Sequence, residues 1–113
     1  MKRDYRDYIN DILESINDTE NFVAGLSFEE FVKDKKTMNA AVRSLEILGE
    51  AAKNIPEKIK KKHPKIPWKE MAGMRDKLIH EYHGVDHQIV WTVIKEELPP
   101  LKSQIEKIAE KTE

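Results

Sequence analysis

The chain has 113 residues, with 20 Lys or Arg against 21 Asp or Glu, and it contains no cysteine. This balance of charge argues against a general polyanion binder. The lack of cysteine excludes disulfides, thiol nucleophiles and cysteine-ligated zinc sites. No apolar run approaches the length of a membrane span, and the charged start Met1–Tyr5 is unlike a signal peptide. We therefore expect one domain over residues 1–113, in the cytoplasm and without membrane contact.

The first half of the sequence predicts two long helices joined by a short one. Apolar residues recur every three or four positions over about Asp4–Ala24, and Gly25 is placed to end that helix. Ser27 followed by Glu30 has the form of a capping box, which should open a short helical turn. A second amphipathic stretch predicts a long helix over about Lys35–Asn54.

Prolines and glycines divide the second half into further helices. Pro56 suits the first position of a short lysine-rich helix. The pattern over Pro67–Tyr82 predicts another helix, which Gly84 should end. Asp86 is placed to cap the last helical stretch. The pair Pro99-Pro100 predicts a kink or a restart within that stretch, because proline lacks an N–H donor and clashes with the preceding turn.

The order and spacing of these elements predict the fold class. Leucine, isoleucine, glutamate and lysine dominate the composition, and no segment shows strand-like alternation. The connections are too short for neighbouring helices to run parallel. We therefore expect an all-α fold, an antiparallel bundle of four to five helices.

The candidate chemistry gathers in one segment near the end of the predicted helix Pro67–Tyr82. Arg75 offers a permanent charge with a planar fork suited to phosphate, and His80 is a candidate general acid or base. Tyr82 adds a hydroxyl. On one helix Arg75 and Tyr82 would share a face, whereas Arg75 and His80 would lie about 140° apart. Two copies of the helix crossed in a dimer could bring guanidinium and imidazole together.

The pattern R-x4-H-x-Y formed by Arg75, His80 and Tyr82 resembles the signature of HepT-like toxins in the HEPN superfamily. The flanking segments agree with that family in the same order. Ala40–Ala52 (AAVRSLEILGEAA) is similar to its second helix. Pro67-Trp68 followed by Met71–Asp76 (MAGMRD) is similar to the entry into its catalytic helix. The resemblance extends over most of the chain.

The resemblance implies a HEPN-like helical bundle that forms a homodimer. It implies a metal-independent endoribonuclease without a cofactor, in which Arg75 and His80 of both protomers line a cleft and act as catalytic residues on RNA. It also implies a toxin of a type II or AMPylation-controlled toxin–antitoxin system, paired with a nucleotidyltransferase antitoxin. Tyr82 would position the substrate or accept AMP. The alternative is a non-catalytic binding partner whose main chemistry is to be that AMP acceptor.

Each of these residues also has a purely structural interpretation. Arg75 could pair with Asp76 or Glu70 on a solvated surface, and Tyr82 could close one end of the core. The histidines of this region are spaced like metal ligands, but Gly84 should interrupt the helix that such a site needs, so we expect no metal. The three histidines are His80, His83 and His87.

The sequence leaves two interpretations open for each of three further features. The run Lys58–Lys65 is either a solvated face, which we favour, or an electrostatic guide for an RNA backbone. Trp68 and Trp91 are expected in the core or at a dimer interface, because they lie in apolar stripes. The charged row on the second long helix either forms surface ion pairs or approaches the catalytic segment. That row consists of Arg43, Glu46 and Glu50.

Overall fold

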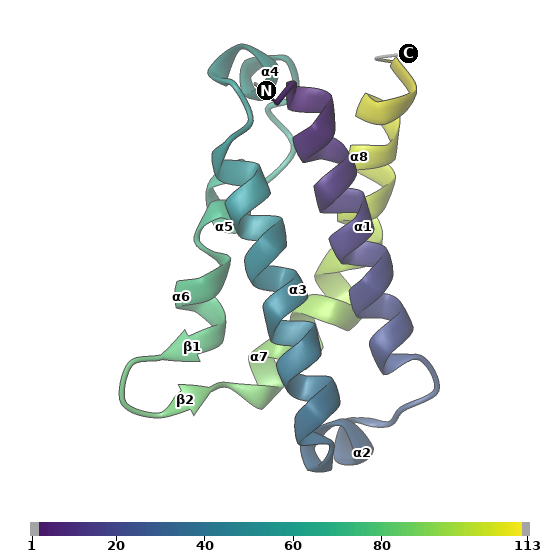
Figure 1. Cartoon of the computed structure of the whole chain (residues 1–113), viewed down its shortest axis with the longest axis vertical. Helices are drawn as coiled ribbons and strands as arrows, with labels where there is room; N and C mark the ends of the chain where they lie inside the picture. The colour runs from purple at the N-terminus through teal and green to yellow at the C-terminus, as the bar shows by residue number, and fades with distance from the viewer. Residues whose placement is uncertain (1–2, 112–113) are drawn as a thin grey trace.

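The structure, a computed structural model, describes residues 3–111 and is almost entirely helical there (Figure 1). The longest helices lie in the first half and at the end of the chain. Between them the chain forms short helices and one two-stranded hairpin. In chain order the elements are α1 (Tyr5–Val23), α2 (Phe28–Lys33), α3 (Lys35–Lys53), α4 (Glu57–Lys62), α5 (Trp68–Ala72), α6 (Met74–Leu78), β1 (Ile79–His80), β2 (Gly84–Val85), α7 (His87–Thr92), η1 (Val93–Glu97) and α8 (Leu98–Lys111).

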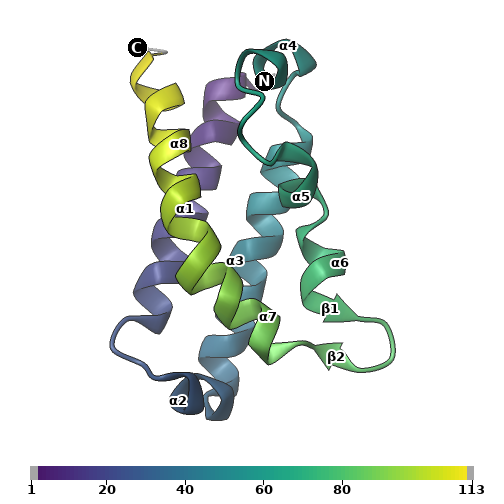
Figure 2. The ribbon, with the colours of Figure 1, turned by 180° about the vertical axis from the view of Figure 1, so that it is seen from behind.

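The helices form an antiparallel up-and-down bundle, as the sequence predicts. In Figure 1, α1 and the α5–α6 segment descend, whereas α3 and the continuous α7–η1–α8 segment ascend. The view from behind shows α8 lying across α1 and α3 (Figure 2). Helix α1 packs against α3 and α8, and α3 also packs against α5 and α6. The predicted all-α, four-to-five-helix bundle is therefore confirmed.

Side-chain caps fix the starts of the helices in the first half. The Ser27 hydroxyl accepts from the Glu30 N–H at 3.1 Å, and the Glu30 carboxylate accepts from the Ser27 N–H at 2.9 Å. This is the predicted capping box. Asp34 caps α3 by accepting from the Thr37 N–H at 3.0 Å. Gly25, with a φ of +80°, ends the first helical stretch in the left-handed conformation that glycine favours.

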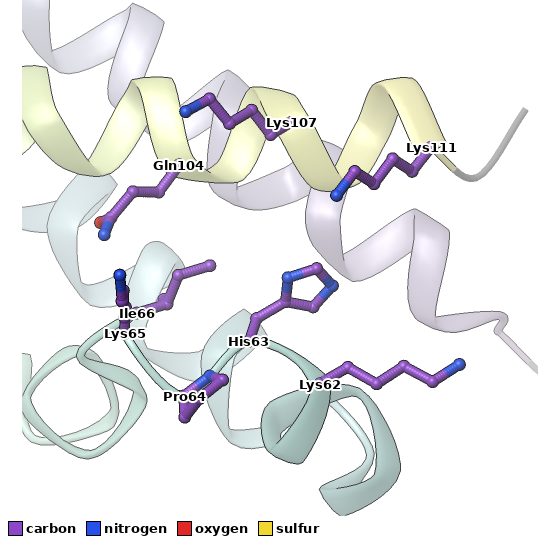
Figure 3. Close-up of a pocket in the computed structure, with 8 residues that line it drawn as sticks. All are labelled: Lys62, His63, Pro64, Lys65, Ile66, Gln104, Lys107 and Lys111. Carbon is purple, nitrogen blue, oxygen red and sulfur yellow. The ribbon is translucent and has the colours of Figure 1, made fainter.

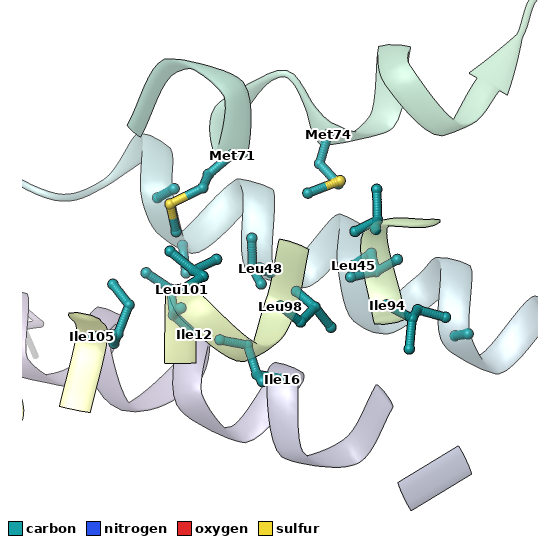
Figure 4. Packing of buried hydrophobic residues seen from close by; sticks show 14 of the residues in the cluster. Ile12, Ile16, Leu45, Leu48, Met71, Met74, Ile94, Leu98, Leu101 and Ile105 are labelled. Carbon is teal, nitrogen blue, oxygen red and sulfur yellow. The ribbon is translucent and has the colours of Figure 1, made fainter. Parts of the chain in front are cut away.

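The core lies between the long helices and α5–α6. Apolar side chains from α1, α3, α5, α6, η1 and α8 meet in one buried cluster (Figure 4). Trp68 belongs to it, as expected, and Trp91 is half-buried against the rings of Phe28 and Phe31. Burial of this apolar surface is the main force that holds α5 and α6, each only five residues long, in place. The side chains labelled in Figure 4 are Ile12, Ile16, Leu45, Leu48, Met71, Met74, Ile94, Leu98, Leu101 and Ile105.

The prediction of one continuous helix over Pro67–Tyr82 is wrong, because the helix is interrupted at Gly73 and ends before the predicted position. Helix α5 stops at Ala72, α6 stops at Leu78, and the chain then forms the antiparallel hairpin β1–β2, in which Ile79 pairs with Val85. Gly84, with a φ of +73°, lies inside β2 and does not end a helix. β-Branched residues at paired positions and a glycine after a short turn favour a hairpin.

The last helical stretch changes geometry just before its two prolines. A single π-helical turn, η1, precedes α8, and the Leu98 N–H bonds to the carbonyl of Val93, five residues back. Pro99 and Pro100 cannot donate hydrogen bonds to the carbonyls one turn earlier, so a wider turn there is physically reasonable. The chain stays helical through Pro99 and Pro100, so the restart predicted at the prolines is wrong; the change of geometry is the π-helical turn just before them. None of the helices within residues 3–111 is both long and apolar enough to cross a bilayer.

Candidate functional site

Arg75 projects from α6 into a hollow between that helix and α3. Its side chain is 74% exposed, and its Nε lies 3.7 Å from a carboxylate oxygen of Glu46 on α3. At that distance and exposure the ion pair is weak, so the guanidinium stays available to an external anion. The hollow has a volume of about 390 Å³. Its charged lining comes from both helices: Arg43, Glu46, Glu50, Lys53, Arg75 and Asp76.

This lining decides one alternative that the sequence leaves open. Arg43, Glu46 and Glu50 approach the segment that carries Arg75, so they are more than a row of ion pairs on the surface of one helix. The structural alternative, in which Arg75 pairs with Asp76 or Glu70, is wrong, because its carboxylate partner is Glu46.

A close contact at Gly49 sets the distance between α3 and the Arg75 segment. A Cβ atom at Gly49 would lie 2.8 Å from the carbonyl oxygen of Met71 and 3.3 Å from Cβ of Met74. The first of these distances is too short for any residue with a side chain. Glycine at this position therefore lets α5 and α6 approach α3 closely, and this approach brings Arg75 beside Glu46.

His80 lies on the hairpin and faces the start of α7. It ends β1, and its Nε2 is 3.3 Å from a carboxylate oxygen of Asp86. The imidazole is 48% exposed, so one side contacts the carboxylate while solvent or a substrate can reach the rest. A carboxylate beside an imidazole fixes the orientation of the ring.

Asp86 has two roles, of which the sequence predicts only one. As expected, it caps α7, where its side chain accepts from the Ile89 N–H at 3.0 Å. That hydrogen bond, followed by the contact with His80, lowers the pKa of the Asp86 carboxyl. The carboxylate therefore stays ionised near neutrality and faces His80 as a negative charge. Sequence reasoning missed this second role, because only the hairpin brings His80 back to the cap.

Tyr82 lies in the turn between β1 and β2 and is 89% exposed. The suggestion that it closes the core is therefore wrong. The prediction that it shares a helix face with Arg75 is also wrong, because the helix ends at Leu78. The phenol instead stands free at the tip of the hairpin, where another macromolecule could reach its hydroxyl.

The structure brings the three candidate residues into one region without joining them directly. Arg75 faces α3, His80 faces α7 and Tyr82 faces solvent; among residues 3–111 no hydrogen bond or ion pair links any two of them. His83 and His87 lie in the turn and at the start of α7, so the three histidines do not share one helix. Within that described range no three His, Asp or Glu side chains are grouped to hold a metal ion.

Comparison with known proteins identifies relatives of the whole chain. The family model described as "Ribonuclease HepT-like" matches residues 12–108. A protein of Thermococcus cleftensis named "Probable ribonuclease HepT" is 54% identical, over 96% of this chain and 98% of the relative. A protein of Caldanaerobacter subterraneus whose name describes an RNase is 52% identical, over 94% of this chain and 95% of the relative.

An archaeal relative extends this comparison. A Methanocaldococcus jannaschii protein, also named as an RNase, is 50% identical over 95% of this chain and 88% of its own length. No solved structure matches the chain. The range matched by the family model, residues 12–108, contains Arg75, His80 and Tyr82.

Proposed function

The chain belongs to the HepT-like ribonuclease family, and from this membership we propose that it is the toxin of a toxin–antitoxin system. In this proposal it is a metal-independent endoribonuclease with Arg75 and His80 as catalytic residues, and a nucleotidyltransferase antitoxin controls it. One observation carries the proposal: an exposed guanidinium and an imidazole held by a carboxylate lie five positions apart in the chain, in the R-x4-H-x-Y pattern.

The chemistry needs only water and groups that this chain supplies. The 2′-hydroxyl oxygen of RNA attacks the adjacent phosphorus, and the bond from phosphorus to the 5′ oxygen breaks. His80 takes the hydroxyl proton, and water gives a proton to the leaving oxygen. Arg75 stabilises the negative charge that grows on the phosphorane. An exposed arginine with only a distant carboxylate partner suits that role.

A second copy of the chain would supply the missing half of this arrangement. Within one chain, the Arg75 guanidinium faces Glu46 of α3 and the His80 imidazole faces Asp86 at the start of α7. The two groups therefore point at different neighbours. A twofold dimer in which the hairpins and the α6 helices meet would place arginine and histidine from different copies on one phosphate.

A second candidate function rests on the exposure of Tyr82. In it the chain is a binding partner without catalytic activity, and the Tyr82 hydroxyl accepts AMP from a nucleotidyltransferase. The phenolic oxygen attacks the α-phosphorus of ATP, pyrophosphate leaves, and a base of the transferase takes the proton. An aromatic side chain that is 89% exposed at a hairpin tip is accessible to such an enzyme. The added phosphate would also repel RNA from the site.

RNA cleavage in excess chelator tests the proposed activity. The purified parent should cut RNA, whereas Arg75→Ala and His80→Ala should each lower the rate by at least about a hundredfold, as expected for loss of a charge-stabilising group or a general base. Lys69→Ala and His87→Ala serve as controls, because they remove an exposed cation and an exposed imidazole nearby.

The same assay separates the two candidates. A parent that leaves RNA intact, while mass spectrometry after incubation with the transferase and ATP finds AMP on Tyr82, supports the binding partner. Cleavage that survives in His80→Ala contradicts the catalytic assignment.

A further inference from the structure

The end of the bundle farthest from the β1–β2 hairpin carries a basic hollow that the proposed chemistry does not use. It lies between the connector from α4 to α5 and the last turns of α8, and its volume is about 370 Å³ (Figure 3). In that view lysines from both sides border the same space. The polar side chains that line it are Lys62, His63, Lys65, Gln104, Lys107 and Lys111.

No carboxylate among residues 3–111 neutralises the positive charge of this hollow. Within residues 3–111, none of the four lysines has a carboxylate within ion-pair distance, whereas Lys60 and Lys102 nearby are paired with Glu57 and Glu20. On α8 the lining residues Gln104, Lys107 and Lys111 are spaced by three and four, so they share one face. Glu106 and Glu110 of the same helix do not line the hollow. Four cations facing one space repel each other unless an anion joins them.

The connector that follows Lys62 and carries Lys65 is held by the core. The indole N–H of Trp68 donates to the carbonyl of His63 at 3.0 Å, and the N–H of Ile66 donates to the same carbonyl at 3.2 Å. Both Trp68 and Ile66 are buried. The lysines on either side of His63 therefore start from a fixed backbone, which lowers the entropy cost of binding an anion there.

A second hollow adjoins the first and is suited to a different part of a ligand. It also has a volume of about 370 Å³ and shares Lys62, His63 and Lys111 with the basic hollow. Its other lining is largely apolar, from Tyr5, Ile59 and Ile108. A nucleotide presents both a phosphate and a flat base that can stack on an aromatic ring, so the adjoining hollows match RNA better than they match an acidic peptide.

We propose that the basic hollow binds backbone phosphates of the RNA substrate at a distance from the cleavage site. The proposal rests on the ribonuclease function proposed above and extends it. Figures 1 and 2 place α4 and the C-terminal end of α8 at one end of the longest axis and the hairpin toward the other. That axis measures 41 Å, and a stacked strand advances 3.4 Å per nucleotide, so about a dozen nucleotides would reach from one site to the other. The hollow thus selects long RNA over short RNA.

The test compares two triple variants on two lengths of RNA. Lys62→Gln/Lys107→Gln/Lys111→Gln removes three cations of the hollow, and Lys33→Gln/Lys35→Gln/Lys36→Gln removes three exposed cations at the junction of α2 and α3. All six lysines are exposed, so both variants should fold, which circular dichroism checks. Binding is measured with a 20-nucleotide 2′-O-methyl RNA, which lacks the attacking hydroxyl. Cleavage is measured with unmodified RNA of the same length and with a dinucleotide.

The hollow variant should bind the long RNA at least about tenfold more weakly than the parent. The slope of the logarithm of its binding constant against the logarithm of salt concentration should be smaller in magnitude by about two, because each phosphate contact in a single strand contributes about 0.7 to that slope. The control variant should stay within twofold of the parent. Cleavage of the dinucleotide should be the same in all three proteins, since a dinucleotide cannot reach both sites. The corresponding triple Lys→Arg variant should restore binding of the long RNA.

Two outcomes overturn the inference. The first is that the hollow variant and the control variant bind the long RNA equally well. The second is that a polyglutamate peptide binds the hollow as tightly as the RNA does. Failure of the proposed ribonuclease function would give a different result. The parent would then cut neither RNA, while loss of binding in the hollow variant would still identify an RNA site.

Discussion

Asp86 connects the local fold to the candidate chemistry at the scale of single residues. One carboxylate oxygen accepts from the Ile89 N–H and caps α7, and the other lies 3.3 Å from Nε2 of His80. The residue that fixes the start of the helix therefore also orients the imidazole. In the proposed reaction Asp86 is a positioning residue, because it acts through His80.

Serine at position 86 should separate these two roles. Asp86→Ser keeps a good helix cap but removes the charge beside His80. We expect a thermal unfolding midpoint close to that of the parent, a kcat for RNA cleavage lower by about tenfold or more, and an unchanged KM. Asp86→Ala, which loses the cap as well, should lower both the midpoint and kcat. A kcat for Asp86→Ser equal to that of the parent would contradict the positioning role.

The residues of the site follow from the sequence only in part. Arg75, His80 and Tyr82 are identified by their spacing, since a motif is read directly from the order of residues. The sequence leaves the approach of Glu46 as one of two alternatives and does not predict the contact of Asp86 with His80, because each contact depends on how two elements meet. The hairpin brings Asp86 to His80, and the packing of α6 on α3 brings Glu46 to Arg75.

At the scale of elements, the segment from Trp68 to Val85 departs most from sequence expectation. Periodicity predicts one helix there, and the structure has two short helices and a hairpin. Short helices contribute little stability of their own, so tertiary packing decides where they end. By contrast α1 and α3, with strong apolar stripes and side-chain caps, begin and end within one residue of the predicted positions.

Alanine at Gly49 should move α5 and α6 away from α3. The gain in helix propensity is about 1 kcal/mol, and the cost of forcing a Cβ against the Met71 carbonyl is typically about 1–3 kcal/mol. We expect Gly49→Ala to lower the free energy of unfolding by about 1 kcal/mol and to reduce RNA cleavage, because the Arg75 segment shifts.

Gly73→Ala is the matched control for this prediction. A Cβ atom at Gly73 would meet no atom closer than 3.5 Å, so this variant should be as stable as the parent or more stable. Urea unfolding measures both variants. Equal stability of Gly49→Ala and Gly73→Ala would mean that the close contact at Gly49 has no energetic effect.

The helix caps should make the protein less stable in acid. Hydrogen bonds, from Thr37 to Asp34 and from Ile89 to Asp86, are the main causes that lower the pKa of these two carboxyls in the folded chain. At low pH the unfolded chain then binds more protons than the folded chain does. The stabilisation that these two carboxylates contribute is therefore complete above the ordinary carboxyl pKa, and it is lost as the pH falls through the lowered pKa values. Thermal unfolding followed from pH 7 to pH 2 should show a falling midpoint below about pH 5.

Asparagine caps should flatten this dependence on the acid side. Asp34→Asn/Asp86→Asn keeps side-chain caps that do not titrate. Asp18→Asn, a substitution in α1 at a residue that caps no helix, is the control and should follow the parent. An acid limb of unchanged slope in the double variant would show that other groups determine acid stability.

At the scale of the whole molecule, the bundle leaves its two charged regions at different ends. The hairpin and α6 carry the proposed cleavage groups, and the α4 connector with α8 carries the basic hollow. The antiparallel bundle follows from the sequence, because apolar periodicity and short connections are local signals. The basic hollow does not follow from the sequence, since its lysines come from two segments that lie more than 40 residues apart in the chain.

The composite site is the central claim, and mixing two inactive variants tests it most directly. Arg75→Ala and His80→Ala chains are purified separately, mixed so that subunits exchange, and assayed on RNA in excess chelator, with exchange verified by native mass spectrometry. After exchange, about half of the dimers contain one chain of each variant. In each of these dimers, one of the two sites holds an intact arginine and an intact histidine from different chains. We predict that each variant alone is inactive and that the mixture recovers up to about a quarter of the parental rate. An inactive mixture of verified mixed dimers, or a parent that cuts RNA at full rate as a monomer, would contradict the account.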